Sequence, residues 1–265
     1  MKLVPPKKVR IFTYNTFSSA LLLEPKALEI IFHDDYFDSE VLFELESIIA
    51  WCTSHTEVKS IVFSCRGNQF IQGFNLEEMK TFDESKILKL YSKLHHINQG
   101  LTCLPQTIVV DLKEGAKNEG LTFASFADVR VSTEQALFQF DQITHGLLDA
   151  TGLFSKSINK LNISTLRSLV LSAIEFNIDT LNNLGCFTIT NKTSEQILNN
   201  VAQQSNMARA QTKCALIGLT EEDNKDHDFI NKIFKALLST SDYKKEAEFI
   251  NLRVLKENLQ NAEMN

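Results

Sequence analysis

Residues 58–79 read VKSIVFSCRGNQFIQGFNLEEM and decide the fold class, because they combine a strand, a tight loop and the start of a helix. Residues 58–63 form an apolar, β-branched run of the length of a buried strand. The polar residues 66–68 then break this run. Gly73 allows the backbone to turn sharply or to approach a ligand closely. The stretch therefore predicts a buried strand followed by a loop whose backbone can approach a ligand.

The helix that follows this loop is expected to begin next to Asn75. An asparagine can cap a helix N-terminus, and Glu77 and Glu78 suit the first turn of a helix because of its dipole. The backbone amide of Phe74 would then lie at the positive end of that dipole. Such an amide can stabilise negative charge that develops on an oxygen atom.

The rest of the chain alternates between strand-like and helix-like patterns, which predicts an α/β architecture. The first portion carries strands with a polar break at residues 15–19, and a long C-terminal portion is helical. Strand candidates are residues 10–17, 20–24, 27–32, 58–63 and 106–112. Helix candidates are residues 40–52, 84–101, 155–161, 164–173, 194–219, 228–238 and 241–259.

The composition excludes several classes of protein. The chain has 265 residues, 43% of them hydrophobic, which is enough for one large core. The net charge of −6 and the lack of a basic cluster argue against a nucleic-acid partner. Five cysteines without C-x-x-C spacing predict neither disulfides nor a metal site. No signal peptide and no run of ~18 apolar residues is visible, so we expect a cytoplasmic protein without a membrane span.

The loop also carries a family signature. It resembles the crotonase (enoyl-CoA hydratase/isomerase) superfamily, whose members have G-x-x-F-x-x-G-x-D-[LI]-x-x-M after a strand. Residues 67–79 keep this pattern except that Asn75 replaces the aspartate. The resemblance implies that the residue after the second glycine, Phe74, gives one backbone N–H of an oxyanion hole.

A second family motif lies in residues 113–132, after the predicted strand 106–112. The superfamily's glycine triplet survives there only as Asn118-Glu119-Gly120. The resemblance implies that the backbone of Glu119 donates the second N–H of the oxyanion hole. It also implies that Gln72, Phe74 and Gly120 contact the bound thioester, an acyl-CoA or acyl-carrier thioester, with no further cofactor.

The two carboxylates of a hydratase are absent from their expected positions. By the resemblance, the first catalytic glutamate falls at Thr122 and the second at Gln142. Hydration of a double bond needs a base for water and an acid for carbon, and neither threonine nor glutamine supplies them. We therefore expect no simple hydratase activity.

Asp149 is the candidate proton carrier in place of these glutamates. Some non-hydratase relatives carry an acid in the corresponding turn, here residues 146–152. The alternative is that Asp149 caps a helix, since small and apolar residues follow it. Both interpretations remain open from the sequence.

The resemblance implies a crotonase-like (ββα)n spiral, with a core over residues 1–190 and a C-terminal helical region over residues 191–265 that forms homotrimers or hexamers. It implies an enzyme that binds an acyl thioester and stabilises an enolate, of isomerase or lyase type rather than a hydratase. The alternative is a non-catalytic acyl-CoA-binding or structural protein that kept the fold. The missing carboxylates, the broken glycine triplet and the short acidic path over residues 32–39 favour this alternative.

Overall fold

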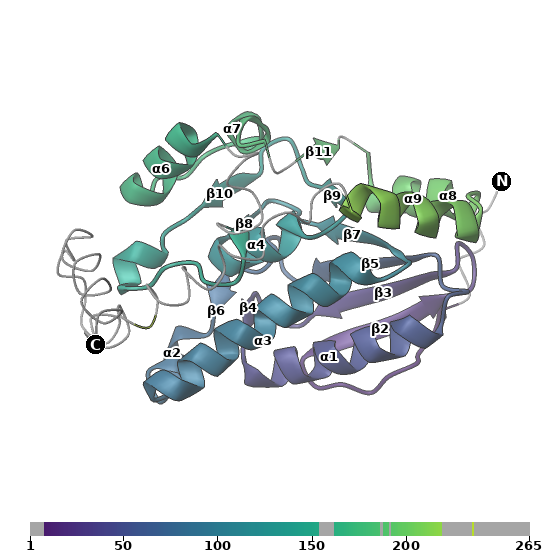
Figure 1. The fold of residues 1–265 in the computed structure, drawn as a ribbon, viewed down its shortest axis with the longest axis horizontal. Helices are drawn as coiled ribbons and strands as arrows, with labels where there is room; N and C mark the ends of the chain where they lie inside the picture. The colour runs from purple at the N-terminus through teal and green to yellow at the C-terminus, as the bar shows by residue number, and fades with distance from the viewer. Residues whose placement is uncertain (1–7, 154–161, 186–187, 191, 219–234, 236–265) are drawn as a thin grey trace.

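A seven-stranded sheet forms the centre of the protein in the computed structural model, which describes residues 8–153, 162–185, 188–190, 192–218 and 235 (Figure 1). Strands β1 to β3 pair antiparallel, and the pairs from β3 to β11 are parallel. The sheet order is β1 (Lys8–Val9), β2 (Phe17–Leu22), β3 (Ala27–Phe32), β5 (Ser60–Cys65), β7 (Thr107–Asp111), β9 (Val129–Val131) and β11 (Ile189–Thr190). The α/β prediction is confirmed.

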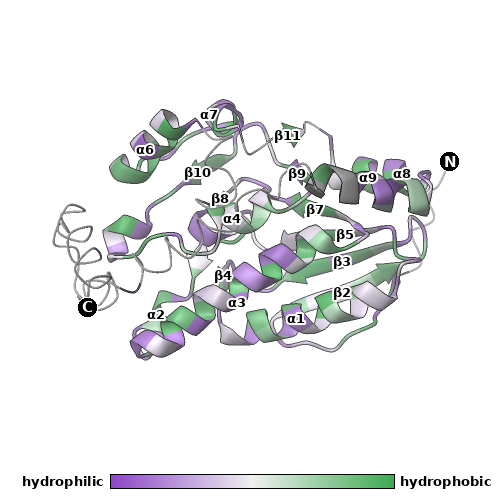
Figure 2. Cartoon of the chain, in the orientation of Figure 1, coloured by the Kyte–Doolittle hydropathy of each residue, from purple (hydrophilic) through white to green (hydrophobic). Residues whose placement is uncertain are grey.

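Helices α1 (Ser39–Ser54) and α3 (Glu84–Cys103) cover one face of this sheet (Figure 1). Alternate residues of the strands point toward them, as the period of two in a strand requires. Ile30, Phe63 and Val110 are such residues and belong to the main hydrophobic core. Figure 2 shows the same arrangement, with hydrophobic strands in the middle and helices that carry both hydrophobic and hydrophilic residues.

Helix α8 (Ser194–Ala202) packs on the other face of the sheet. It contacts strand residues that alternate with those of the main core. Leu198 forms a small cluster with Val62 and Val109. The predicted helix over residues 194–219 is wrong in one respect, because it is two helices: α8 ends at Ala202 and α9 (Asn206–Gly218) begins four residues later.

The proposed boundary between core and C-terminal region at residue 190 stays a prediction. The helix candidates 155–161 and 241–259, most of 228–238, and the greater part of the predicted trimerisation region lie outside the described residues.

Two small parallel sheets lie beside the large one and carry the loops of interest. In one, β4 (Tyr36–Phe37) pairs with β6 (Gly73–Phe74); in the other, β8 (Gly115–Lys117) pairs with β10 (Leu137–Gln139). Between and after them come α2 (Leu76–Met79), α4 (Asn118–Ser125), the 3-10 helix η1 (Gln142–His145), α6 (Ile163–Ser172) and α7 (Ile178–Asn183).

The predicted strand over residues 10–17 is wrong. Paired strand structure ends at Val9 and resumes at Phe17. At residues 15 and 16 a tertiary contact stands in place of strand pairing: the buried carboxylate of Glu44 on α1 accepts hydrogen bonds from the backbone N–H groups of Asn15 (2.9 Å) and Thr16 (3.1 Å). These amides are therefore engaged by a side chain and not by a neighbouring strand.

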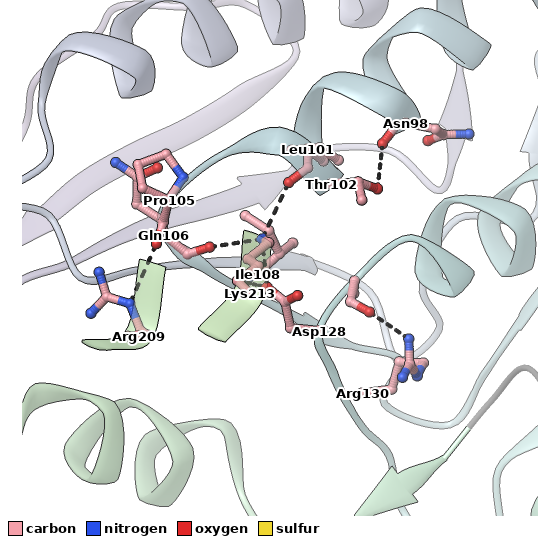
Figure 3. A network of polar contacts seen from close by, with 11 residues as sticks. Asn98, Leu101, Thr102, Pro105, Gln106, Ile108, Asp128, Arg130, Arg209 and Lys213 are labelled. Atoms are coloured by element: carbon pink, nitrogen blue, oxygen red, sulfur yellow. Dashed lines mark hydrogen bonds and ion pairs between the residues drawn. The ribbon is translucent and has the colours of Figure 1, made fainter. Parts of the chain in front are cut away.

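A buried lysine fixes α9 to the core (Figure 3). The Lys213 Nζ lies 2.7 Å from Asp128 Oδ2 and donates to the carbonyl oxygens of Gln106 (2.9 Å) and Leu101 (3.4 Å). Asp128 Oδ2 also accepts the backbone N–H of Ile108 at 2.7 Å. One cation thus connects α9 to the end of α3, the start of β7 and the start of β9. Within the part of the chain that the structure describes, no helix has the length and apolar character needed to cross a membrane.

Candidate functional site

A cavity of about 350 Å³ lies where β6, α4 and η1 come together. It is the cavity that the sequence motifs surround, since both family signatures contribute to its wall. Its lining residues are Asp35, Tyr36, Gln72, Gly73, Phe74, Leu76, Tyr91, Lys117, Asn118, Glu119, Asp141, Gln142, His145 and Leu147.

The local structure of the first signature places Phe74 at this cavity. Gly73 has φ of 145°, a conformation that side-chain-bearing residues rarely adopt. The predicted cap is confirmed, because Asn75 accepts hydrogen bonds from the N–H groups of Glu77 (3.1 Å) and Glu78 (3.2 Å). Asn75 in turn donates its own N–H to Phe37 O at 2.8 Å. The turn is therefore fixed on both sides of Phe74.

The second signature forms the first turn of α4, which packs tightly against the first. A Cβ atom on Gly120 would lie 1.9 Å from Ile71 O, so only glycine fits at this position. Asn118, with φ of 46°, begins the helix and is held from its side chain: its Nδ2 donates to Gln72 O (3.1 Å) and to Asp141 Oδ1 (2.6 Å). These contacts bring the N-terminus of α4 beside β6.

The Glu119 side chain turns inward into this junction and is only 2% exposed. The backbone N–H groups of Glu119 itself and of Phe74 lie close enough to its carboxyl group to lower its pKa. Its Oε2 also lies against Gly73, at 3.0 Å from where a Cβ of that residue would stand. The two amides that the sequence analysis selects thus converge on one carboxyl group.

Two side chains donate to the Glu119 carboxyl group. Tyr91 Oη on α3 donates to Oε1 at 3.4 Å, and Gln142 Nε2 on η1 does so at 3.5 Å. Burial, and after it the negative charge of Asp149, raise the pKa of Glu119 to about 8, while the hydrogen bonds lower it. Glu119 therefore carries a proton over much of the neutral range.

Asp149 lies next to Thr122, the residue at the position of the first hydratase glutamate. Thr122 Oγ1 donates to Asp149 Oδ2 at 2.7 Å, and the N–H and Oγ1 of Thr151 donate to Oδ1 at 2.7 and 2.6 Å. The backbone N–H of Leu153 is a further donor. Burial raises the pKa of Asp149, and these hydrogen bonds oppose that rise.

The two positions that lack a glutamate therefore each contact another carboxyl group. Thr122 contacts Asp149, and Gln142 contacts Glu119. Two buried acids, Asp149 and Glu119, therefore lie beside the positions at which the resemblance places the hydratase glutamates.

The structure brings Gln72, Phe74 and Glu119 together at the cavity wall. Gly120 and Asp149 are buried but are not among the lining residues, so neither faces the cavity directly. The described residues contain no group of three or more His, Cys, Asp or Glu side chains arranged to hold a metal ion.

Sequence reasoning missed Tyr91, Asn118 and Asp141. Tyr91 packs on Phe74 with ring centroids 4.6 Å apart, but it lies on α3, whose apolar periodicity gives no sign that one ring reaches a site. Asn118 and Asp141 form a reciprocal pair, since Asn118 Oδ1 also accepts the Asp141 N–H at 2.8 Å. The signal for that pair was the polar asparagine in place of a glycine.

Comparisons with known proteins identify the family of the chain. The family model of enoyl-CoA hydratase/isomerase matches residues 32–246. YngF of Bacillus subtilis (strain 168), described as a putative enoyl-CoA hydratase/isomerase, is 24% identical over 115 residues, which cover 43% of this chain and 44% of that relative. The chain thus matches less than half the length of this relative.

Solved structures of enoyl-CoA hydratases share the fold. That from Bacillus halodurans superposes with a TM-score of 0.75 at 18% identity, covering 88% of this chain and 98% of that one. That from Mycobacterium avium gives a TM-score of 0.75 at 11% identity, covering 88% and 95%. The predicted crotonase fold is confirmed. Because the family model spans well over half of its length, the chain belongs to the enoyl-CoA hydratase/isomerase family.

Proposed function

We propose that this protein binds an acyl thioester in the cavity beside β6 and α4, and that it stabilises an enolate there without hydrating the acyl chain. The backbone N–H groups of Phe74 and Glu119 would hold the thioester oxygen. The reaction type is then that of an isomerase or a lyase.

The observation that carries this proposal is the pair of amides. The N–H groups of Phe74 and Glu119 both lie near the carboxyl group of Glu119 and lower its pKa, and its Oε2 lies against Gly73, so both amides are close to one small oxygen-bearing group. A carboxyl oxygen stands in well for an enolate oxygen, which is also an acceptor with partial or full negative charge. Two preorganised backbone donors in a buried site are an effective way to stabilise that charge.

Asp149, which lies behind the cavity wall in this structure, is the group we propose to move the proton once the wall opens beside it. Its carboxylate lies 2.7 Å from the Thr122 hydroxyl, beside the position of the first hydratase glutamate. Burial raises its pKa, which brings a carboxylate closer to the strength of a base that works near neutral pH. Enolate formation needs one such carboxylate, because the amides acidify the α-hydrogen.

A second candidate function is acyl-thioester binding without turnover. One observation favours it: the Asp149 carboxylate already accepts from Thr122, from both donors of Thr151 and from Leu153. A carboxylate has about four acceptor positions, so these donors fill it. Turnover requires that one of them gives way.

Hydration of crotonyl-CoA should be at least about 10²–10⁴-fold slower than with a hydratase that has both glutamates, since a general acid–base contributes that factor. The loss of the enoyl absorbance measures the rate, with such a hydratase assayed in parallel. Hydration at a comparable rate would contradict the proposal, because Thr122 and Gln142 hold neither role.

A further inference from the structure

The Glu119 side chain occupies the two amides that a thioester would need. Its carboxyl group lies against Gly73, with Oε2 3.0 Å from where a Cβ of that residue would stand, and near the N–H groups of Phe74 and of Glu119 itself, which lower its pKa. Further contacts come from Tyr91 and Gln142. A thioester oxygen at the same amides would overlap this carboxyl group. The site as it stands is therefore satisfied by its own chain.

We propose that Glu119 is a self-inhibitory plug of the oxyanion hole, which must swing out before a thioester can bind. This inference rests on the proposed function, and it adds a mode of regulation to the same site. The adjacent cavity of about 350 Å³, which Glu119 itself lines, offers the side chain room to move.

An ordinary structural role for Glu119 is the alternative. An acid in the first turn of a helix often accepts backbone N–H groups of that turn, and Glu119 is in the first turn of α4. That role explains the contact with its own N–H, but it does not require the contact with Phe74, which lies in β6. A cap also has no reason to be packed against Gly73 and beneath Tyr91.

The plug has a defined dependence on pH. In the closed state burial holds the pKa of Glu119 at about 8, whereas a side chain that reaches water returns toward the ordinary value of 4.5. Below pH 8 the closed state therefore carries a proton that the open state releases. Opening, and with it thioester binding, becomes more favourable as the pH rises from about 5 to about 8, by at most about tenfold per pH unit, and levels off above that.

Other titratable groups lie close enough to be considered. Tyr91 and Asp149 act on Glu119 electrostatically, and the pKa of each is raised by burial, so Tyr91 stays neutral across this range. The remaining titratable residues of the cavity wall are Asp35, Tyr36, Lys117, Asp141 and His145. A variant that changes Glu119 alone separates its contribution from theirs.

The test compares binding of acetyl-CoA and of free CoA by isothermal titration calorimetry to the wild type, Glu119→Ala and Glu119→Gln. Free CoA has no thioester oxygen and so does not need the two amides. We expect Glu119→Ala to bind acetyl-CoA at least about tenfold more tightly than the wild type, with the affinity for free CoA unchanged. Glu77→Ala is the matched control, because Glu77 is a nearby acid whose side chain is 82% exposed, and it should change neither affinity.

The outcomes separate the two proposals. Equal or weaker binding of acetyl-CoA by Glu119→Ala, with binding by the wild type intact, would overturn the plug and leave the proposed function standing. If no form of the protein binds acetyl-CoA more tightly than free CoA, the proposed function fails instead.

A pH series covers the case in which Glu119→Ala does not fold. The affinity of the wild type for acetyl-CoA should rise at least about tenfold between pH 6 and pH 8, and the isosteric Glu119→Gln should show no such rise. The same profile for both proteins would overturn the plug.

Discussion

Exchange of the α-hydrogens of acetyl-CoA with D₂O should fall by about 10²–10⁴-fold when Asp149 is replaced by asparagine. This exchange reports enolate formation directly, whatever the natural acyl chain is. Asparagine keeps the shape of the side chain but cannot take up a proton, and loss of a general base has an effect of this size. NMR of the acetyl methyl signal measures the exchange rate, and calorimetry shows whether acetyl-CoA still binds.

A matched control separates catalysis from stability. Asp149→Asn also disturbs the donors from Thr151 and Leu153, and we expect it to lower the free energy of unfolding by about 1–3 kcal/mol. Thr122→Val removes a different hydrogen bond to Asp149, from the Thr122 hydroxyl, but leaves the carboxylate in place and with a free acceptor position. It should therefore lose stability while keeping the exchange.

The comparison decides between the two candidate functions. If exchange is absent from the wild type, the protein binds the thioester without turnover. Measurable exchange that is equal in the wild type and Asp149→Asn would instead show that Asp149 is not the base. Loss of exchange in Asp149→Asn alone supports the enolate chemistry.

Replacing Lys213 by methionine should lower the free energy of unfolding by about 3 kcal/mol. The side chain is 10% exposed, and its removal leaves the carboxylate of Asp128 and the carbonyl oxygen of Gln106 without their cation. Breaking a buried pair on one side typically costs 3–5 kcal/mol, and the 31% exposure of Asp128 places the expectation at the lower end. Urea unfolding measures the loss.

Lys80→Met is the control for this prediction. Lys80 pairs with Glu77 on the surface at 2.6 Å, with side chains 59% and 82% exposed. Exposed pairs contribute little, so this variant should change stability by no more than about 0.5 kcal/mol. Similar losses in both variants would contradict the account of Lys213 as the tie between α9 and the core (Figure 3).

Local sequence predicted much of the framework, because local rules govern it. The strand over residues 27–32 and the helix after residue 84 follow from periodicity, and both are found, as β3 and as α3 after its cap Asp83. The cap at Asn75 follows from side-chain chemistry alone. The strand over residues 10–17 failed because a carboxylate on α1, distant in the sequence, binds two of its amides.

The site was predictable in its backbone and not in its side chains. The resemblance placed the amides of Phe74 and Glu119, and the structure brings these two residues to one cavity. The resemblance did not indicate where the Glu119 carboxyl group points. That direction depends on the absence of a side chain at Gly73 and on a tyrosine of α3. Nor did it show that Asp149 would meet Thr122, since the two are 27 residues apart and join only in the folded chain.

The most direct test of the central claim is a crystal structure of the protein with crotonyl-CoA. We expect the thioester oxygen to lie within about 3.2 Å of the backbone nitrogens of both Phe74 and Glu119, a normal hydrogen-bond distance, with the acyl chain in the cavity beside α4. An acyl group bound elsewhere, or a thioester oxygen that contacts neither amide, would contradict the claim.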